Sequence, residues 1–263
     1  MKKIFLTGIV LCLSLSASAW NKHYDQSALL FATDNMTPQA KEFVTTYFGE
    51  NYLSQVQTFA AARKKGNLMH TAEWHTLHLD ANLNPVMSDE NNAAVQIERA
   101  TEVIRNRASK SEEEIKFALH TIVELIIDMH NVGNVYIESI PLSKQDFPMG
   151  ISNGGRGDRE KFAPVTWKYF WSYKFSVFHS VWSPQMFARD LAVCHGRDKE
   201  KFMAGNLQDW AKDWGAVVQA QFEWAYPNYP MSREEHSLNE NTFYAGVARA
   251  GYRIAALLNE IVK

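Results

Sequence analysis

The sequence predicts an all-α fold, a single-domain bundle of many helices. Apolar residues recur at helical spacing along most of the 263-residue chain, and the alternation that marks strands is scarce. Several segments begin with residues that cap helices, and no repeat, low-complexity tract or linker divides the chain. A chain of this length is expected to form one domain with a sizeable core.

Capping and stop signals define the helices of the N-terminal half. Thr37 and Pro38 open the first helix, because proline is tolerated in a first helical turn, and Gly49 stops it. Ser111, with Glu114 three residues on, forms a capping box that opens a strongly apolar helix. The helices predicted for this half span residues 37–48, 52–64, 91–107 and 111–129.

Glycine and proline mark the loops. They concentrate in residues 131–163, the longest segment predicted to be irregular, and residues 66–90 are predicted to be irregular as well. A loop this long inside a domain is typically functional or mobile. We expect the packed helices to form a cleft beneath the N-terminus and this loop. Further helices are predicted near residues 167–182, 198–224 and 232–261.

The N-terminus has the pattern of a secretory signal peptide. Lys2 and Lys3 precede an apolar run over residues 4–15, and Ala17-Ser18-Ala19 supplies the small residues that a signal peptidase reads. Cleavage is predicted before Trp20, which implies a periplasmic or secreted protein. No apolar stretch after Trp20 is long enough to span a bilayer, so no integral membrane segment is expected in the mature form. The predicted organisation is a signal peptide over residues 1–19 and a helical domain over residues 20–263.

The charge balance argues against non-specific binding of a nucleic acid duplex. Two of the 27 lysines and arginines lie in the signal peptide, so the predicted mature chain carries 25 basic against 29 acidic side chains, a net charge of −4. Such a chain has no general basic field, and any nucleic acid has to be captured at a specific site. After Cys12 is removed with the signal peptide, Cys194 has no partner for an internal disulfide.

A polar stripe runs along the helix predicted over residues 111–129. His120, Glu124 and Asp128 recur every four residues and therefore share one face of an otherwise apolar helix. Such a stripe either faces solvent or points at a buried site. From the helix alone, we expect a solvated stripe rather than a site.

Histidines supply further candidates. His70, His75 and His78 lie close together in an irregular segment, where they are able to bind a metal, although their spacing matches no strong zinc signature. His179 ends an apolar run, and a single histidine in that setting is more often part of a core than a ligand.

Several motifs follow one another in a fixed order across residues 20–263. They are Trp20 after the signal peptide, Thr37-Pro38-Gln39-Ala40, Leu77-His78-Leu79-Asp80 followed by Asn84-Pro85, Ile126-Ile127-Asp128-Met129, Phe178-His179-Ser180-Val181-Trp182, and Gly251-Tyr252-Arg253-Ile254-Ala255 followed by Asn259-Glu260-Ile261. This ordered set resembles the zinc-dependent single-strand-specific nucleases of the nuclease S-one/P-one type, a superfamily shared with bacterial zinc phospholipases C.

The resemblance implies a helical bundle of the zinc nuclease/phospholipase C type. In that family three zinc ions share a deep cleft, and a metal-bound hydroxide attacks the phosphorus of a phosphodiester while the other ions hold the phosphate and the leaving oxygen. The implied reaction is metal-dependent endonuclease or phosphodiesterase hydrolysis. Four of the nine family ligand positions carry the family's residue type here: Trp20, His78, Asp128 and His179.

The other five ligand positions are substituted. Asp25 and Glu124 stand where the family has histidines and are still able to bind a metal. Ala61 has no donor atom, and Asn134 and Ser183 are poor zinc ligands. The resemblance therefore implies one or two divalent cations rather than the full three-zinc cluster, with zinc or a harder ion such as Mg²⁺, Mn²⁺ or Ca²⁺. The implied ligands are Trp20, Asp25, His78, Glu124, Asp128 and His179.

These observations predict an exported zinc-nuclease-family protein whose catalysis is lost or strongly reduced. Single-stranded nucleic acid, a nucleotide or a phosphate ester are the ligands expected in its cleft. Two alternatives stay open. One is an active endonuclease or phosphodiesterase that uses one or two metals, and the other is a metal-free periplasmic or secreted ligand-binding protein whose cleft is polar and empty of metal.

Overall fold

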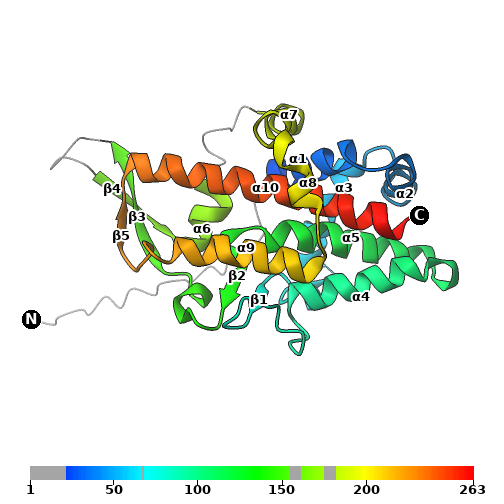
Figure 1. The fold of residues 1–263 in the computed structure, drawn as a ribbon, viewed down its shortest axis with the longest axis horizontal. Helices are drawn as coiled ribbons and strands as arrows, with labels where there is room; N and C mark the ends of the chain where they lie inside the picture. The colour runs from blue at the N-terminus through cyan, green and yellow to red at the C-terminus, as the bar shows by residue number, and fades with distance from the viewer. Residues whose placement is uncertain (1–21, 67, 155–160, 175–181) are drawn as a thin grey trace, which may run out of the picture.

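Five predicted helices lie close to their expected positions in the computed structural model, which describes residues 22–66, 68–154, 161–174 and 182–263 (Figure 1). The predicted signal peptide and Trp20 lie outside the described residues. Another helix, α1 (Lys22–Asp34), precedes the first predicted one. The five confirmed helices are α2 (Pro38–Phe48), α3 (Tyr52–Lys65), α4 (Ala93–Arg105), α5 (Glu112–Met129) and α10 (Arg233–Ile261).

The ends of these helices follow from their capping residues. The hydroxyl oxygen of Thr37 accepts a hydrogen bond from the backbone N–H of Ala40, the third residue of α2, at 3.2 Å. Gly49 ends that helix with a φ of +79°, which glycine adopts at little cost. Ser111 and Glu114 form the predicted capping box, and a second box opens α10. The local sequence therefore sets where these helices begin and end.

Helix α5 lies between α4 and α10 in the helical body (Figure 1). Ile122, Leu125 and Ile126 are at most 1% exposed, and the polar residues of its second half are buried as well. A helix that is buried nearly all round has to place its polar groups in the interior of the protein. The acidic side chains of α5 therefore have to find their hydrogen-bond or charge partners inside the protein.

The contact between α1 and α10 leaves no room for a side chain at Gly251. The ring of Phe31 meets that of Tyr252 edge to face, with centroids 4.7 Å apart. A Cβ added to Gly251 would lie 2.8 Å from Phe31 and 3.0 Å from the carbonyl oxygen of Ala28. The two helices therefore approach closely because residue 251 is glycine.

A buried arginine joins α10 to the residue that ends α5 and to an aspartate in another helix. One amino group of Arg253 donates to a carboxylate oxygen of Asp213 at 2.5 Å, and the other donates to Nε2 of His130 at 2.6 Å. Because Nδ1–H of His130 donates to the carbonyl oxygen of Ile126 at 2.6 Å, Nε2 acts as the acceptor. Burial, followed by the charge of Arg253, holds the pKa of His130 well below its usual range, so the imidazole is neutral.

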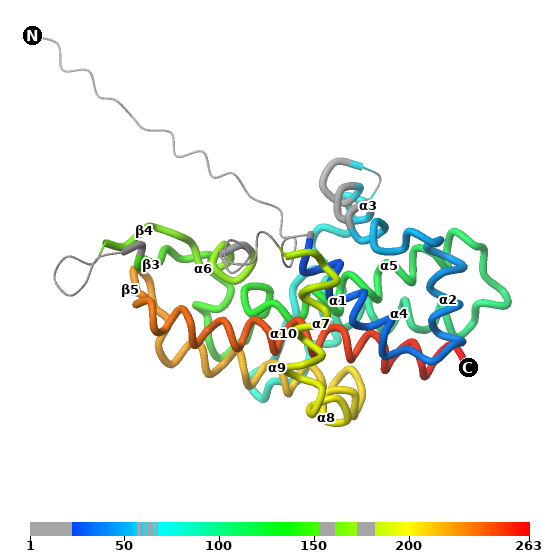
Figure 2. The backbone as a smooth tube through the Cα atoms, turned by 90° about the horizontal axis from the view of Figure 1, so that it is seen from above, coloured from blue at the N-terminus to red at the C-terminus, as the bar shows by residue number. Residues whose placement is uncertain are grey.

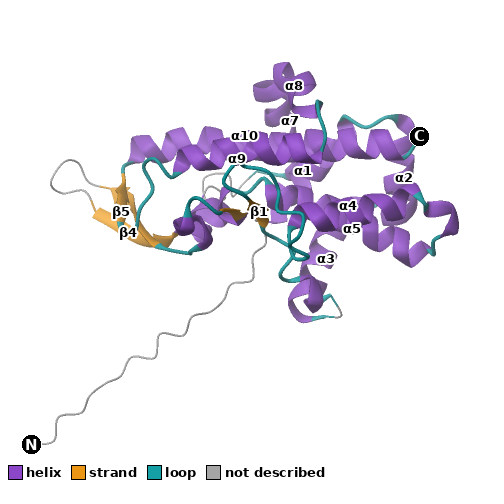
Figure 3. Ribbon diagram, turned by 60° about the horizontal axis from the view of Figure 1, so that its bottom comes forward, coloured by secondary structure: helices purple, strands orange, loops and turns teal. Residues whose placement is uncertain are grey.

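Two small sheets correct the prediction that residues 66–90 and 131–163 are irregular. β1 (Leu77–Leu79) pairs in parallel with β2 (Val135–Ile137). β3 (Pro148–Gly154) lies between antiparallel β4 (Lys161–Thr166) and parallel β5 (Tyr229–Met231). Figure 3 shows this sheet in orange, at one end of the helical body. The protein is therefore mostly helical but not purely so. Strands of three residues are too short to show the alternation by which strands are recognised.

The segment between β4 and α10 also differs in detail from the prediction. The helix expected over residues 167–182 begins as α6 (Trp167–Tyr169) and continues as a π-helical segment, Phe170–Lys174, while residues 175–181 lie outside the described residues. Trp167, Phe170 and Trp171 are buried, so these rings belong to the core. The prediction missed α7 (Pro184–His195), and two helices, α8 (Lys199–Met203) and α9 (Leu207–Gln221), stand where one was expected near residues 198–224.

The three-stranded sheet lies at one end of the molecule and α2 at the other, with α9 and α10 running between them (Figure 2). In the described ranges we find no helix whose length and apolar character would let it cross a membrane.

Gly251→Ala is expected to lower the free energy of unfolding by about 1–3 kcal/mol, because α1 and α10 have to move apart to admit the methyl group. Gly196→Ala is the matched control. Its backbone is helical and nothing lies within 4 Å of the added Cβ, so stability should be unchanged or slightly higher. Urea unfolding measures both, and equal effects of the two substitutions would contradict this account of the helix contact.

His120 is a buried titratable group on α5. Its ring lies against Phe48 and Phe59, with centroids 4.3 and 4.7 Å away. Burial, with a smaller contribution from Lys116, lowers the pKa of His120 to about 4. In the unfolded chain the pKa of histidine is about 6.5. The unfolded chain therefore takes up a proton more readily, and folding stability falls as the pH drops from about 6.5 to about 4.

His120→Phe is expected to remove this part of the acid sensitivity, which amounts to at most about 3 kcal/mol. The measurement is the free energy of unfolding in urea at pH 7 and near pH 4.5. His70→Phe replaces an exposed histidine and should lose as much stability on acidification as the unsubstituted protein. If His120→Phe loses the same amount, His120 is not the source.

Candidate metal centre

Helix α5 brings two carboxylates into the interior. Glu124 and Asp128 lie one turn apart and are 5% and 1% exposed, and His120 on the same face is 8% exposed. The expectation of a solvated stripe is therefore wrong, and the alternative of a buried polar face is correct. The stripe is buried because α5 is covered on this face as well as on its apolar one.

The turn that leads into β1 adds a histidine to these acids. His75 is 4% exposed, and its Nδ1 contacts a carboxylate oxygen of Asp128 directly. One donor atom each from His75, Glu124 and Asp128 lie within 4.8 Å of one another. We call these three residues the His75 cluster.

The structure places His78 outside the His75 cluster. Its Nδ1 lies 2.8 Å from a carboxylate oxygen of Asp89, its Nε2 lies 4.0 Å from Glu138, and its ring lies 4.4 Å from that of Tyr136. The hydrogen bond to His78 is the largest of several effects that lower the pKa of Asp89. His78 alternates along β1 with two buried leucines, so its side chain leaves the opposite face of the strand.

The remaining described ligand positions that the resemblance implies lie in different parts of the structure, outside the His75 cluster. Asp25 is buried in the first turn of α1 but contributes no atom to the His75 cluster. Ala61 lies in α3. The amide of Asn134 donates to the second carboxylate oxygen of Asp128 at 3.4 Å, and Ser183 caps α7 by accepting the N–H of Met186 at 3.2 Å. Trp20 and His179 lie outside the described residues.

The His75 cluster has donors that suit a divalent cation. Carboxylates buried this deeply are stable only when protons or positive charges neutralise them. One imidazole and two carboxylates are able to bind Zn²⁺, and the excess of oxygen donors also suits harder ions such as Mn²⁺ and Mg²⁺. Asn134 supports one of these carboxylates from outside, as is usual around metal ligands.

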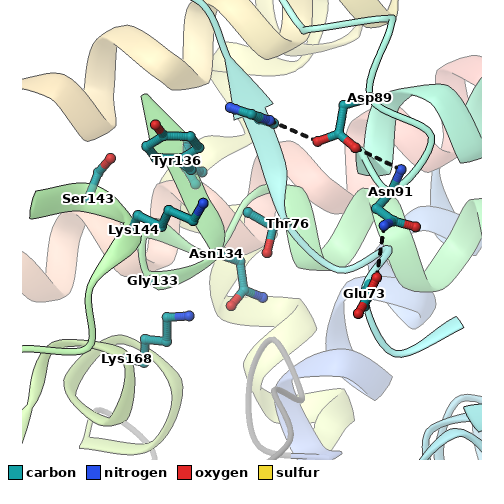
Figure 4. Close-up of a pocket in the computed structure, with 12 residues that line it drawn as sticks. Glu73, Thr76, Asp89, Asn91, Gly133, Asn134, Tyr136, Ser143, Lys144 and Lys168 are labelled. Atoms are coloured by element: carbon teal, nitrogen blue, oxygen red, sulfur yellow. Dashed lines mark hydrogen bonds and ion pairs between the residues drawn. The ribbon is translucent and has the colours of Figure 1, made fainter. Parts of the chain in front are cut away.

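A cavity of about 300 Å³ opens next to the His75 cluster. Asn134 connects the two, since it lines the cavity and donates to Asp128. His78 and Asp89 form part of another wall, and the predicted irregular segment supplies Tyr136 and Lys144 (Figure 4). A cleft was expected beneath the N-terminus and residues 131–163; this segment lines the cavity, while residues 1–21 lie outside the described part of the chain.

Comparison with known proteins adds no assignment, since neither a family model nor a curated protein matches the chain. The sequence did single out His75 together with His70 and His78, but the likeness of Leu77-His78-Leu79-Asp80 to a family motif favoured His78. The signal that separates them is the alternation of β1, which directs Leu77 and Leu79 inward and His78 away from them.

His75→Gln is expected to weaken Mn²⁺ or Zn²⁺ binding by about a hundredfold or more, because it removes a ligand. The matched change three residues on, His78→Gln, should leave the affinity within about threefold of the original. Isothermal titration calorimetry on protein first stripped with a chelator measures both. Loss of binding in His78→Gln with retention in His75→Gln would show that the motif, and not the His75 cluster, identifies the ligand.

Proposed function

We propose that this chain is an exported zinc-nuclease-like protein that holds one divalent cation at His75, Glu124 and Asp128, and whose phosphodiester hydrolysis is lost or strongly reduced. The observation that carries the proposal is the His75 cluster, which has the donors for a single ion. A bound ion would supply Lewis-acid chemistry there, lowering the pKa of water and polarising an oxygen of a phosphate ester.

Reduced hydrolysis follows from what stands at the other ligand positions. Asn134 donates a hydrogen bond to Asp128, and Ser183 caps a helix, so both side chains already have structural partners. Ala61 has no donor atom. In the family, three ions together stabilise one transition state. When two of those ions have no site, the rate of hydrolysis falls by far more than the loss of a single interaction would cause.

A metal-free binding protein is the second candidate function. Nδ1 of His75 contacts Asp128 directly, so the imidazole is able to satisfy that carboxylate by a hydrogen bond without an ion. Metal would then be dispensable, and the neighbouring cavity would be the functional feature.

The first experiment is thermal unfolding of the exported, untagged protein after chelation, with and without added Mn²⁺ or Zn²⁺. A ligand at a hundred times its dissociation constant stabilises by about 2.7 kcal/mol, so we expect the midpoint to rise by about 5–10 °C. Glu124→Gln and Asp128→Asn should abolish the rise. Asp89→Asn, which alters a carboxylate outside the His75 cluster, should retain it.

Cleavage of single-stranded DNA in the presence of the same metals separates the remaining alternatives. We expect the rate of the unsubstituted protein to be no greater than that of Asp128→Asn. Metal-dependent cleavage that Asp128→Asn abolishes would show an active phosphodiesterase instead. A midpoint that no metal shifts would exclude the cation and leave the metal-free binding protein.

A further inference from the structure

Two lysines form one wall of the cavity beside the His75 cluster. Lys144 ends the short helical turn Pro141–Lys144, and Lys168 lies in the first turn of α6. Figure 4 shows both ammonium groups extending into the cavity from the same side. Among the described residues neither forms an ion pair with a carboxylate, and the ammonium of Lys144 lies 5.3 Å from the centre of the Tyr136 ring. Lys144 is near enough to Asp89 to help lower the pKa of that carboxyl, and the backbone N–H of Lys168 donates to Asp146 at 2.8 Å, but within the described part of the chain neither ammonium group is held by an acid.

The acids of the cavity lie on the opposite wall and are held there. The amide of Asn91 donates to Glu73 at 2.8 Å, and its backbone N–H donates to Asp89 at 3.0 Å. His78 bonds the other carboxylate oxygen of Asp89 at 2.8 Å. These contacts, drawn in Figure 4, give both acids hydrogen-bond partners other than the lysines, although the charge of Lys144 still contributes to lowering the pKa of Asp89. The charges are separated across the cavity.

The size and polarity of this cavity restrict what fits. About 300 Å³ is at the small end of ligand pockets and admits a compact molecule. Two ammonium groups on one wall suit an oxyanion, because charge-assisted hydrogen bonds to carboxylate or phosphate are among the strongest available. The hydroxyl of Thr76 lies between the walls (Figure 4) and offers a further polar contact.

The acidic wall of the cavity would repel a ligand that carries several phosphates in a row. Glu73 and Asp89 line the cavity, and Glu138 lies 4.0 Å from His78. A nucleic acid strand that placed one phosphate between the lysines would bring its next phosphates towards these carboxylates, and like charges at close range repel. A ligand with one anionic end and a neutral or positive remainder meets no such repulsion.

We propose that this cavity binds a compact ligand through a single oxyanion head group, held by Lys144 and Lys168, and that its acidic wall excludes polyanionic strands. The proposal goes beyond the cation site and does not require it, because neither lysine belongs to the His75 cluster. The shared chemistry is the oxyanion, which is either a carboxylate or a phosphate.

The test is isothermal titration calorimetry of the chelated, exported protein with inorganic phosphate and, separately, with acetate at neutral pH and low salt. We expect one-to-one binding of at least one probe. Lys144→Gln and Lys168→Gln should each weaken it about tenfold or more, the value for one charge-assisted contact. Lys201→Gln, an exposed lysine on α8, is the matched control and should change nothing. Tighter binding of phosphate indicates a phosphate ester, and tighter binding of acetate indicates a carboxylate.

Three results would overturn the proposal. They are binding of neither probe, unchanged binding in both lysine variants, or tighter binding of a short thymidine oligonucleotide than of either probe. Glu124→Gln separates this test from the cation test, since it should abolish the response to Mn²⁺ and leave the affinity for the oxyanion within about twofold.

Discussion

The carboxylate of Asp128 is the point at which three segments of the chain meet. It leaves the last turn of α5, one of its oxygens contacts His75 ahead of β1, and the other accepts the amide of Asn134 just before β2. The parallel pairing of β1 with β2 holds the two approaching segments side by side. A single buried side chain thus ties the central helix to the small sheet beneath it, and leaving this polar group without partners in the interior would cost about 1–3 kcal/mol.

The part of the fold that the sequence predicts well is the set of five helices α2, α3, α4, α5 and α10. The capping box at Ser111 and Glu114 is a local interaction, and so are the proline and glycine that bound α2. The strands depend on partners far away. β1 pairs with β2, and β3 lies between β4 and β5, across gaps that no local pattern records. Glycine and proline in residues 131–163 therefore suggested loops where tertiary pairing makes strands.

The candidate site shows the same division. The four-residue spacing of Glu124 and Asp128 placed them on one face, and the structure brings them together. Whether that face is buried depends on the elements that cover it, which the helix itself does not encode. The choice between His75 and His78 depended on which way the side chains of the three-residue strand β1 face. The resemblance of Leu77-His78-Leu79-Asp80 to a family motif favoured His78, whose side chain leaves the face of the strand opposite to the buried leucines.

The residues of the His75 cluster lie far apart in the sequence, and this separation affects when they meet during folding. His75 and Asp128 are separated by 53 positions, so the unfolded chain has to close a long loop before the two side chains meet. An extended chain offers no preformed cage, so a cation held by the His75 cluster would bind the folded chain and not the unfolded one. The free energy of cation binding would then stabilise only the native state. It would lower the rate of unfolding and leave the rate of folding unchanged.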